Sequence, residues 1–196
     1  MNVLLASMVL AASQASAPGT VPKADSAAKP VEAGPVVVLD TSLGAIKIEL
    51  NRAKAPVSVD NFLKYVKAKH YDGTIFHRVM PNFMIQGGGM DETMTEKAAG
   101  APIKNEGQNG LRNERGTIAM ARLPARDSAT AQFFINVKNN TTSLDYPNNG
   151  GYAVFGRVIE GMDVVDKIVS VRTGNKKGHE NVPVTPVVIK TARLAQ

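Results

Sequence analysis

Arg78 and Gln86 are polar residues in a mostly apolar stretch of the sequence, residues 75–89. Two short strands are predicted here, because a Pro81-Asn82 turn separates two apolar runs. A guanidinium and a carboxamide on such a hydrophobic platform could together grip a peptide group by hydrogen bonds. The simpler alternative is that Arg78 lays its stem along apolar surface and keeps its charged head in water.

The first of these strands also carries a histidine beside the arginine. Side chains alternate along a strand, so adjacent residues should point to opposite faces. His77 and Val79 are therefore predicted on one face, and Phe76 and Arg78 on the other. On this basis His77 is interpreted as a structural histidine rather than a catalytic one.

Other chemistries find little support in the composition. The chain has no cysteine, which excludes disulfides, thiolate nucleophiles and Cys-based zinc sites. Its three histidines show no metal-ligand spacing. The glycines at 87–89 lack the Lys-Ser/Thr of a phosphate loop and are interpreted as a flexible exit from a strand. A net charge of +6 spread along the chain, with 5% aromatic residues and no Trp, argues against nucleic-acid binding.

The elements that must position Arg78 are short strands and two helices. A length of 196 residues suits one domain, which is predicted to begin at Val36 with an alternating hairpin over 36–50. A helix is predicted from Pro56 to about His70, and a shorter one from Gly161, because apolar residues recur there at helical spacing. Further strands are predicted at 117–121, 132–137, 152–158 and 187–192. Many short strands with two amphipathic helices favour a barrel whose ends the helices cover.

The N-terminal segments favour export. Residues 1–17 carry an apolar run that ends in a small-x-small pattern, which is typical of a secretory signal peptide. No Lys or Arg precedes the run, and Pro18 would follow the cut, so a disordered cytoplasmic leader is the alternative. Residues 18–35 are rich in Ala, Pro, Gly, Ser and Lys and are interpreted as a disordered linker. The run is too short for stable insertion across a bilayer.

The apolar stretch also resembles a known family. Residues 76–88 read Phe-His-Arg-Val-Met-Pro-Asn-Phe-Met-Ile-Gln-Gly-Gly, which matches every fixed position of the central motif of the cyclophilins, the peptidyl-prolyl cis-trans isomerases. The resemblance extends from Val36 to about Leu194, with further matches at 131–135 and 152–156.

The resemblance implies both a fold and an activity. The fold would be mainly β: an eight-stranded antiparallel barrel capped by two α-helices, over the domain 36–196. The activity would be the isomerisation of X-Pro bonds in unfolded or flexible proteins, which assists their folding, with no cofactor and no metal. Residues 106–111 and 127–131 look most like the periplasmic bacterial branch of the family. That similarity supports a periplasmic location, with the cytoplasm as the alternative.

The resemblance further assigns roles to individual residues. Arg78 would be catalytic, by hydrogen-bonding the prolyl nitrogen as the amide twists, and Gln86 would hold the substrate carbonyl or orient the arginine. The substrate-binding residues would be Phe83, Met84, Ala121, Arg122, Gln132, Phe134, Leu144 and Tyr152.

Three positions depart from the usual family pattern. Ser143 stands where many members carry Trp, Tyr152 where many carry His, and Arg122 where an Asn follows the Met-Ala pair. The rim of the substrate pocket is thus altered, whereas the group formed by Arg78, Phe83 and Gln132 is intact. We therefore expect altered inhibitor and sequence preference rather than loss of activity.

The sequence supports two functional hypotheses. The first is a cofactor-free isomerase acting on proline-containing polypeptides. The second is a non-catalytic cyclophilin-like module that binds Pro-containing segments. Retention of Arg78 favours the enzyme, because a module that only binds could have lost it. In either case we expect a monomer that does not bind nucleic acid.

Overall fold

The computed structural model describes residues 34–195. The predicted signal peptide, 1–17, lies outside the described residues, as does all of the predicted linker 18–35 except its last two positions. The predicted first strand begins at Val36, where the structure also places it.

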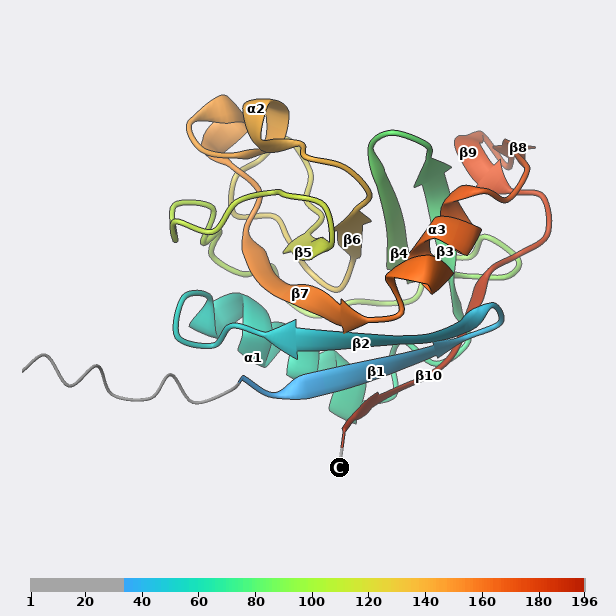
Figure 1. Ribbon diagram of the computed structural model, residues 1–196, viewed down its shortest axis with the longest axis horizontal. Helices are drawn as coiled ribbons and strands as arrows, with labels where there is room; N and C mark the ends of the chain where they lie inside the picture. Colours follow the sequence, from blue (N-terminus) through green and yellow to red (C-terminus); the bar gives the residue numbers. More distant parts are fainter. Residues whose placement is uncertain (1–33, 196) are drawn as a thin grey trace, which may run out of the picture. The chain divides into compact units, whose positions relative to one another are not determined.

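Eight strands form one closed barrel in the order β1-β10-β3-β4-β6-β5-β7-β2 (Figure 1). Every neighbouring pair in it is antiparallel. The strands are β1 (Val36–Thr41), β2 (Gly44–Leu50), β3 (Thr74–Met80), β4 (Met84–Asp91), β5 (Thr117–Met120), β6 (Phe133–Asn136), β7 (Val154–Glu160) and β10 (Val188–Leu194). The predicted eight-stranded antiparallel barrel is confirmed.

Two helices pack on the barrel at opposite ends of β2. Helix α1 (Pro56–Lys67) follows the end of β2, and α3 (Met162–Val169) lies beside its start, where Val164 contacts Gly44 (Figure 1). Pro56 suits the first turn of α1, because the N–H that proline lacks has no helical partner there. The helix ends three residues before the predicted His70, since Lys69 takes a left-handed conformation with φ 54°.

Several short elements were not predicted. They are the one-turn helix α2 (Thr141–Leu144), the 3-10 helix η1 (Asn148–Gly150) and a separate two-stranded sheet of β8 (Thr173–Lys176) and β9 (His179–Pro183). Residues 34–195 therefore contain a third, much shorter α-helix in addition to the two predicted capping helices. These segments are polar and only three to five residues long, so no hydrophobic period marks them in the sequence.

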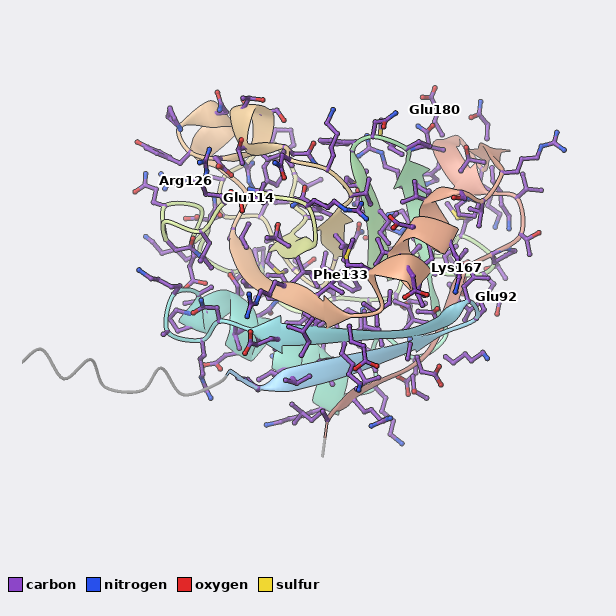
Figure 2. The ribbon with its side chains drawn as sticks, in the orientation of Figure 1. Glu92, Glu114, Arg126, Phe133, Lys167 and Glu180 are labelled. Carbon is purple, nitrogen blue, oxygen red and sulfur yellow. The ribbon has the colours of Figure 1, made fainter. Side chains whose placement is uncertain are left out.

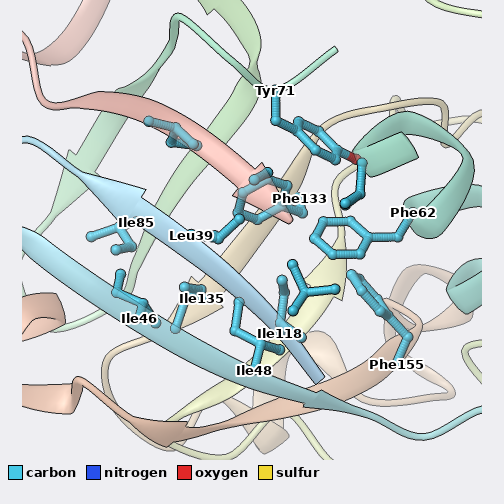
Figure 3. Packing of buried hydrophobic residues seen from close by; sticks show 14 of the residues in the cluster. Leu39, Ile46, Ile48, Phe62, Tyr71, Ile85, Ile118, Phe133, Ile135 and Phe155 are labelled. Atoms are coloured by element: carbon cyan, nitrogen blue, oxygen red, sulfur yellow. The ribbon is translucent and has the colours of Figure 1, made fainter. Parts of the chain in front are cut away.

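Aromatic rings fill the barrel end that α1 covers. Phe62 of α1 lies 5.5 Å from Phe133 and 5.2 Å from Phe155, measured between ring centroids, and Tyr71 lies 5.4 Å from Phe133 (Figure 3). Aliphatic side chains from all sides of the barrel continue this core. Charged residues such as Glu92 and Lys167 lie on the outside (Figure 2).

The predicted faces of β3 are wrong. Phe76 and Val79 both lie in the barrel core, although simple alternation would place them on opposite faces. The register between β3 and β4 shifts between Phe76 and Arg78, so two β3 residues oppose one β4 residue. Such a β-bulge adds one residue and reverses the alternation beyond it. Arg78 therefore does not share a face with Phe76.

The glycines at 87–89 are part of β4 rather than a flexible exit from it. Each is buried, and a Cβ atom at Gly88 would lie 2.8 Å from the Tyr71 ring and 2.9 Å from the Phe133 ring. At Gly89 a Cβ atom would lie 2.5 Å from the Gln132 side chain. Because glycine has no side chain, the Tyr71 and Phe133 rings and the Gln132 side chain can approach the β4 backbone closely.

Gly88→Ala should destabilise the fold much more than Gly178→Ala. Both glycines have positive φ, 84° and 80°, but only Gly88 has neighbours within reach of a Cβ atom. Gly178→Ala should cost only the left-handed backbone penalty, about 1–2 kcal/mol, or roughly 2–4 °C in thermal midpoint per kcal/mol. Gly88→Ala should cost the same backbone penalty and, in addition, the steric clash of the new Cβ atom with the Tyr71 and Phe133 rings. Equal shifts in the two melting curves would show that close ring packing at Gly88 is unimportant.

Candidate active site

Arg78 belongs to a row of residues that crosses the outside of the barrel. Its partner on β4 is Gln86, the partner of Gln86 on β6 is Phe134, and the partner of Phe134 on β5 is Ala119. Directly paired residues of adjacent strands point to the same side of a sheet. One position away, the matching row is Val79, Ile85, Ile135 and Ile118, and all four lie in the core. The row that contains Arg78 therefore faces outward.

A second apolar cluster lies on this outer face. Its buried members are Met84, Ala119, Phe134, Leu144 and Val154, and its half-buried edge consists of Met80, Phe83, Leu111, Ala121 and Tyr152. Six of the predicted substrate-binding residues are among these ten. The remaining four were not predicted as substrate-binding residues: Met80, Ala119 and Val154 lie on strands whose outward-facing residues the sequence pattern does not distinguish, and Leu111 stands in a polar stretch without periodicity.

The polar groups of the row are ordered by different contacts. The Gln86 amide donates a hydrogen bond to Gln132 Oε1 at 2.9 Å, and Gln132 in turn lies against Gly89. Arg78 is half-buried, and within residues 34–195 its guanidinium makes no hydrogen bond or ion pair. Among the described residues, therefore, none accepts a hydrogen bond from the guanidinium of this outward-row arginine.

Arg122 differs from Arg78 in that its donors bond to the chain itself. Its guanidinium donates to the carbonyl oxygens of Leu123, Asn149 and Gly151, at 3.0 Å for Leu123 and at 3.1 Å for Gly151. The same group lies 4.4 Å from the centroid of the Tyr152 ring, which is a cation–π contact. Arg122 thus fixes the rim, and its contact with substrate backbone stays a prediction.

Tyr152 and Leu144 complete the apolar surface beside Phe134. The Tyr152 and Phe134 rings meet edge to face, with centroids 5.8 Å apart. Leu144 is buried at the end of α2, whereas Ser143 is exposed and its hydroxyl donates to the Asn140 carbonyl at 3.1 Å. Ser143 therefore adds no apolar side chain next to Leu144.

An open surface hollow adjoins the cluster. It has a volume of about 390 Å³ and is lined by the loop 107–112 together with Asp145 and Tyr146. Leu111 lines the hollow and also packs against the outer cluster, so the two share this residue. The Arg112–Asp145 ion pair, 3.3 Å long, stands at this hollow.

His77 is buried next to Arg78 on the side of β9. Its Nδ1 atom has no hydrogen-bond partner among the described residues. Burial lowers the pKa of His77 to about 4, with a smaller contribution from the charge of His179 on β9. The ring is therefore neutral at physiological pH, which agrees with a structural role.

The described part of the chain contains neither a cluster of metal ligands nor a membrane-spanning helix. Among residues 34–195, no three His, Asp or Glu side chains are grouped so that they could hold a metal ion. The helices in the same range are too short or too polar to cross a bilayer.

Comparison with known proteins defines the family. The sequence model described as cyclophilin type peptidyl-prolyl cis-trans isomerase matches residues 36–194. A peptidyl-prolyl cis-trans isomerase of Streptomyces antibioticus is 58% identical over 161 residues, which cover 81% of this chain and 97% of the relative. Peptidyl-prolyl cis-trans isomerase B of Escherichia coli is 49% identical, covering 82% and 100% of the two chains.

A solved structure supports the same assignment. A cyclophilin type isomerase of Cryptosporidium parvum, crystallised in the presence of the dipeptide Ala-Pro, superposes with a TM-score of 0.70 at 27% identity, covering 82% of this chain and 99% of that one. The barrel, its outer site and these matches define a cyclophilin fold. The chain belongs to the cyclophilin-type peptidyl-prolyl cis-trans isomerases.

The buried His77 should make the protein less stable in mild acid. Its pKa is about 4 when folded and 6.5 when unfolded, so the unfolded state binds more protons between these values. This contribution to stability is complete above pH 6.5 and is lost as the pH falls toward 4, by roughly 3 kcal/mol in all.

Urea unfolding of His77→Leu between pH 4 and 7 should therefore show a flatter pH dependence than the unmutated protein. His179→Gln is the matched control, because His179 is exposed and its variant should keep most of the slope. An unchanged slope in His77→Leu would mean that His77 is protonated in the folded state or that other groups set the dependence.

Proposed function

We propose that the outer face of β3, β4 and β6 is the catalytic surface, and that it accelerates X-Pro rotation in unfolded or flexible polypeptides. The observation that carries this proposal is the row Arg78–Gln86–Phe134, in which a guanidinium without an acceptor among residues 34–195 shares the outer face with an apolar cluster. In the proposal, the proline ring lies over Phe134, Met84 and Leu144, and Arg78 faces the prolyl nitrogen.

The reaction demands little chemistry from the protein. Rotation about an X-Pro bond faces a barrier of about 18–20 kcal/mol, because the amide loses its resonance when it is twisted. No bond is made or broken, so neither a nucleophile nor a cofactor is required. Catalysis needs only a surface that binds the twisted amide better than the planar one.

Arg78 is suited to that discrimination. As the amide twists, the prolyl nitrogen becomes pyramidal and gains a lone pair that accepts a hydrogen bond. A donor held in place before the reaction costs no reorganisation when this lone pair forms. Gln86, held by its bond to Gln132, would bind the adjacent substrate carbonyl or support Arg78.

Arg78→Ala should lower turnover by about 100-fold or more, while peptide affinity largely survives, because the lost donor acts mainly in the transition state. Arg78→Lys should recover little, since an ammonium lacks the planar fork of the guanidinium. Phe134→Ala is the contrasting variant and should weaken affinity itself, because it removes the floor of the apolar surface.

The measurement is catalytic rate beside peptide affinity for these variants, on a short Ala-Pro peptide. If Arg78→Ala loses affinity in full proportion to rate, Arg78 contributes uniform binding and the transition-state role is wrong. A rate for the unmutated protein no faster than buffer would leave the second hypothesis, a module that only binds Pro-containing segments.

We also propose that the protein acts in the periplasm as a monomer. The apolar run with its small-x-small end in residues 1–17 supports export, and the cytoplasm is the alternative.

N-terminal sequencing of the protein from its native cell should find a chain that begins near residue 18, because a signal peptide is removed on export. A mature chain that still begins at Met1 would contradict export.

Removal of 1–35 from the purified protein should leave thermal midpoint and isomerase rate unchanged, since the predicted linker carries no core-forming pattern. A drop in either would show that this segment supports the domain.

A further inference from the structure

Three buried asparagines lie behind the outer apolar cluster. Asn113, Asn136 and Asn140 are at most 3% exposed, although asparagine is usually a surface residue. A buried carboxamide is costly unless its hydrogen bonds are satisfied. The contacts of these three side chains therefore show what the chain gains by burying them.

The three side chains form one hydrogen-bonded chain, the asparagine network. Asn140 Nδ2 donates to Asn136 Oδ1 at 2.7 Å, and Asn136 Nδ2 donates to Asn113 Oδ1 at 3.1 Å. Asn136 also donates to the Thr117 hydroxyl at 3.0 Å. Each carboxamide nitrogen in the network thus has two acceptors once the outer contacts of Asn113 and Asn140 are included.

Those outer contacts reach the walls of the apolar cluster. At one end, Asn140 Nδ2 donates to the Phe83 carbonyl at 2.8 Å. At the other end, Asn113 Nδ2 donates to Asp145 Oδ1 at 3.0 Å and to the Tyr152 carbonyl at 3.2 Å. The network therefore joins the β3–β4 turn to the segment after α2 and to the start of β7.

These three segments supply different sides of the cluster. Phe83 comes from the β3–β4 turn, Leu144 directly precedes Asp145, and Tyr152 packs on Phe134. In the middle of the network, Asn136 pairs with Met84 across β4 and β6. A change in any of the three carboxamides would therefore alter the spacing between walls that are far apart in sequence.

The conformation of Asn140 shows that its side chain does not serve its own helix. Asn140 is the N-cap residue of α2, a position where an asparagine oxygen usually accepts a hydrogen bond from the first turn. Here it makes no such cap bond, and the carboxamide instead bonds to the Phe83 carbonyl and to Asn136.

We propose that the asparagine network positions the walls of the proline-binding surface and sets its width for a five-membered ring. This inference rests on the proposed function, because it takes the outer cluster to be the proline site. Hydrogen bonds fix directions and lengths that apolar contacts alone would leave adjustable. Asn113, Asn136 and Asn140 are thus positioning residues that determine specificity without touching the substrate.

The test compares two peptides, one with proline and one with pipecolic acid, whose ring is larger by one methylene. The unmutated protein should favour proline in kcat/KM by about tenfold or more, the usual discrimination against one methylene in a fitted apolar pocket. Asn140→Ala should narrow that preference severalfold, mainly by raising KM for the proline peptide. Nuclear magnetic resonance exchange measures both rates without a coupling protease.

Two further variants separate positioning from general stability. Thr74→Val is the control: Thr74 is buried, its hydroxyl donates to the Tyr71 carbonyl at 2.6 Å, and it lies at the far end of β3 from the cluster. It should lower the melting temperature while keeping the preference for proline. Asn140→Ser keeps a short hydrogen-bond donor, so its preference for proline should lie between those of Asn140→Ala and the unmutated protein. If Asn140→Ala does not fold, Asn140→Ser is compared with Thr74→Val in its place.

The outcomes distinguish this inference from the proposed function. The preference for proline over pipecolic acid could stay unchanged in Asn140→Ala and Asn140→Ser while the isomerisation rates of both peptides fall in parallel. That result would show that the network is only structural. An unmutated protein that accelerates neither peptide would overturn the proposed function, and the inference with it. A preference that narrows in Asn140→Ala but not in Thr74→Val is the result we expect.

Discussion

The bulge in β3 is the constraint on which the outer site depends. Phe76 fills the barrel core, and strict alternation from it would place Arg78 in the core as well. Burying an unpaired guanidinium there would cost several kcal/mol. The extra residue lets Phe76 and Val79 both point inward, so that Arg78 emerges beside Gln86 on the outside. Core packing and the position of the guanidinium are therefore settled by the same local distortion.

The outer site follows from the closure of the barrel. Antiparallel pairing carries the inward row from Val79 across to Ile118, and the same pairing carries the outward row from Arg78 to Ala119. This barrel leaves no free edge in its sheet, and core side chains fill its interior, so we expect substrate to bind on its outer surface. Three further segments flank the apolar residues of the outward row and pack against them: the turn before β4, the segment around α2 and the start of β7.

Much of this architecture could be predicted from the sequence. The barrel strands and both longer helices follow hydrophobic periods, and the stretch around Arg78 matches a family motif over thirteen positions, 76–88. The faces of β3 could not be predicted, because a bulge leaves the sequence pattern unmarked while it reverses the alternation. Leu111 and the asparagine network were also missed. Their roles arise from contacts between segments distant in sequence, and a polar residue in a loop gives no sign that it is buried.

In the proposed function, proline binds on the outward row that begins at Arg78. The most direct measurement is a crystal structure of the protein with a short Ala-Pro peptide. We expect the ring in contact with Phe134 and Leu144, and the Arg78 guanidinium within hydrogen-bonding distance of the prolyl nitrogen. A peptide bound instead in the hollow beside Tyr146, with Arg78 making no contact to it, would show that the outward row is not the proline site.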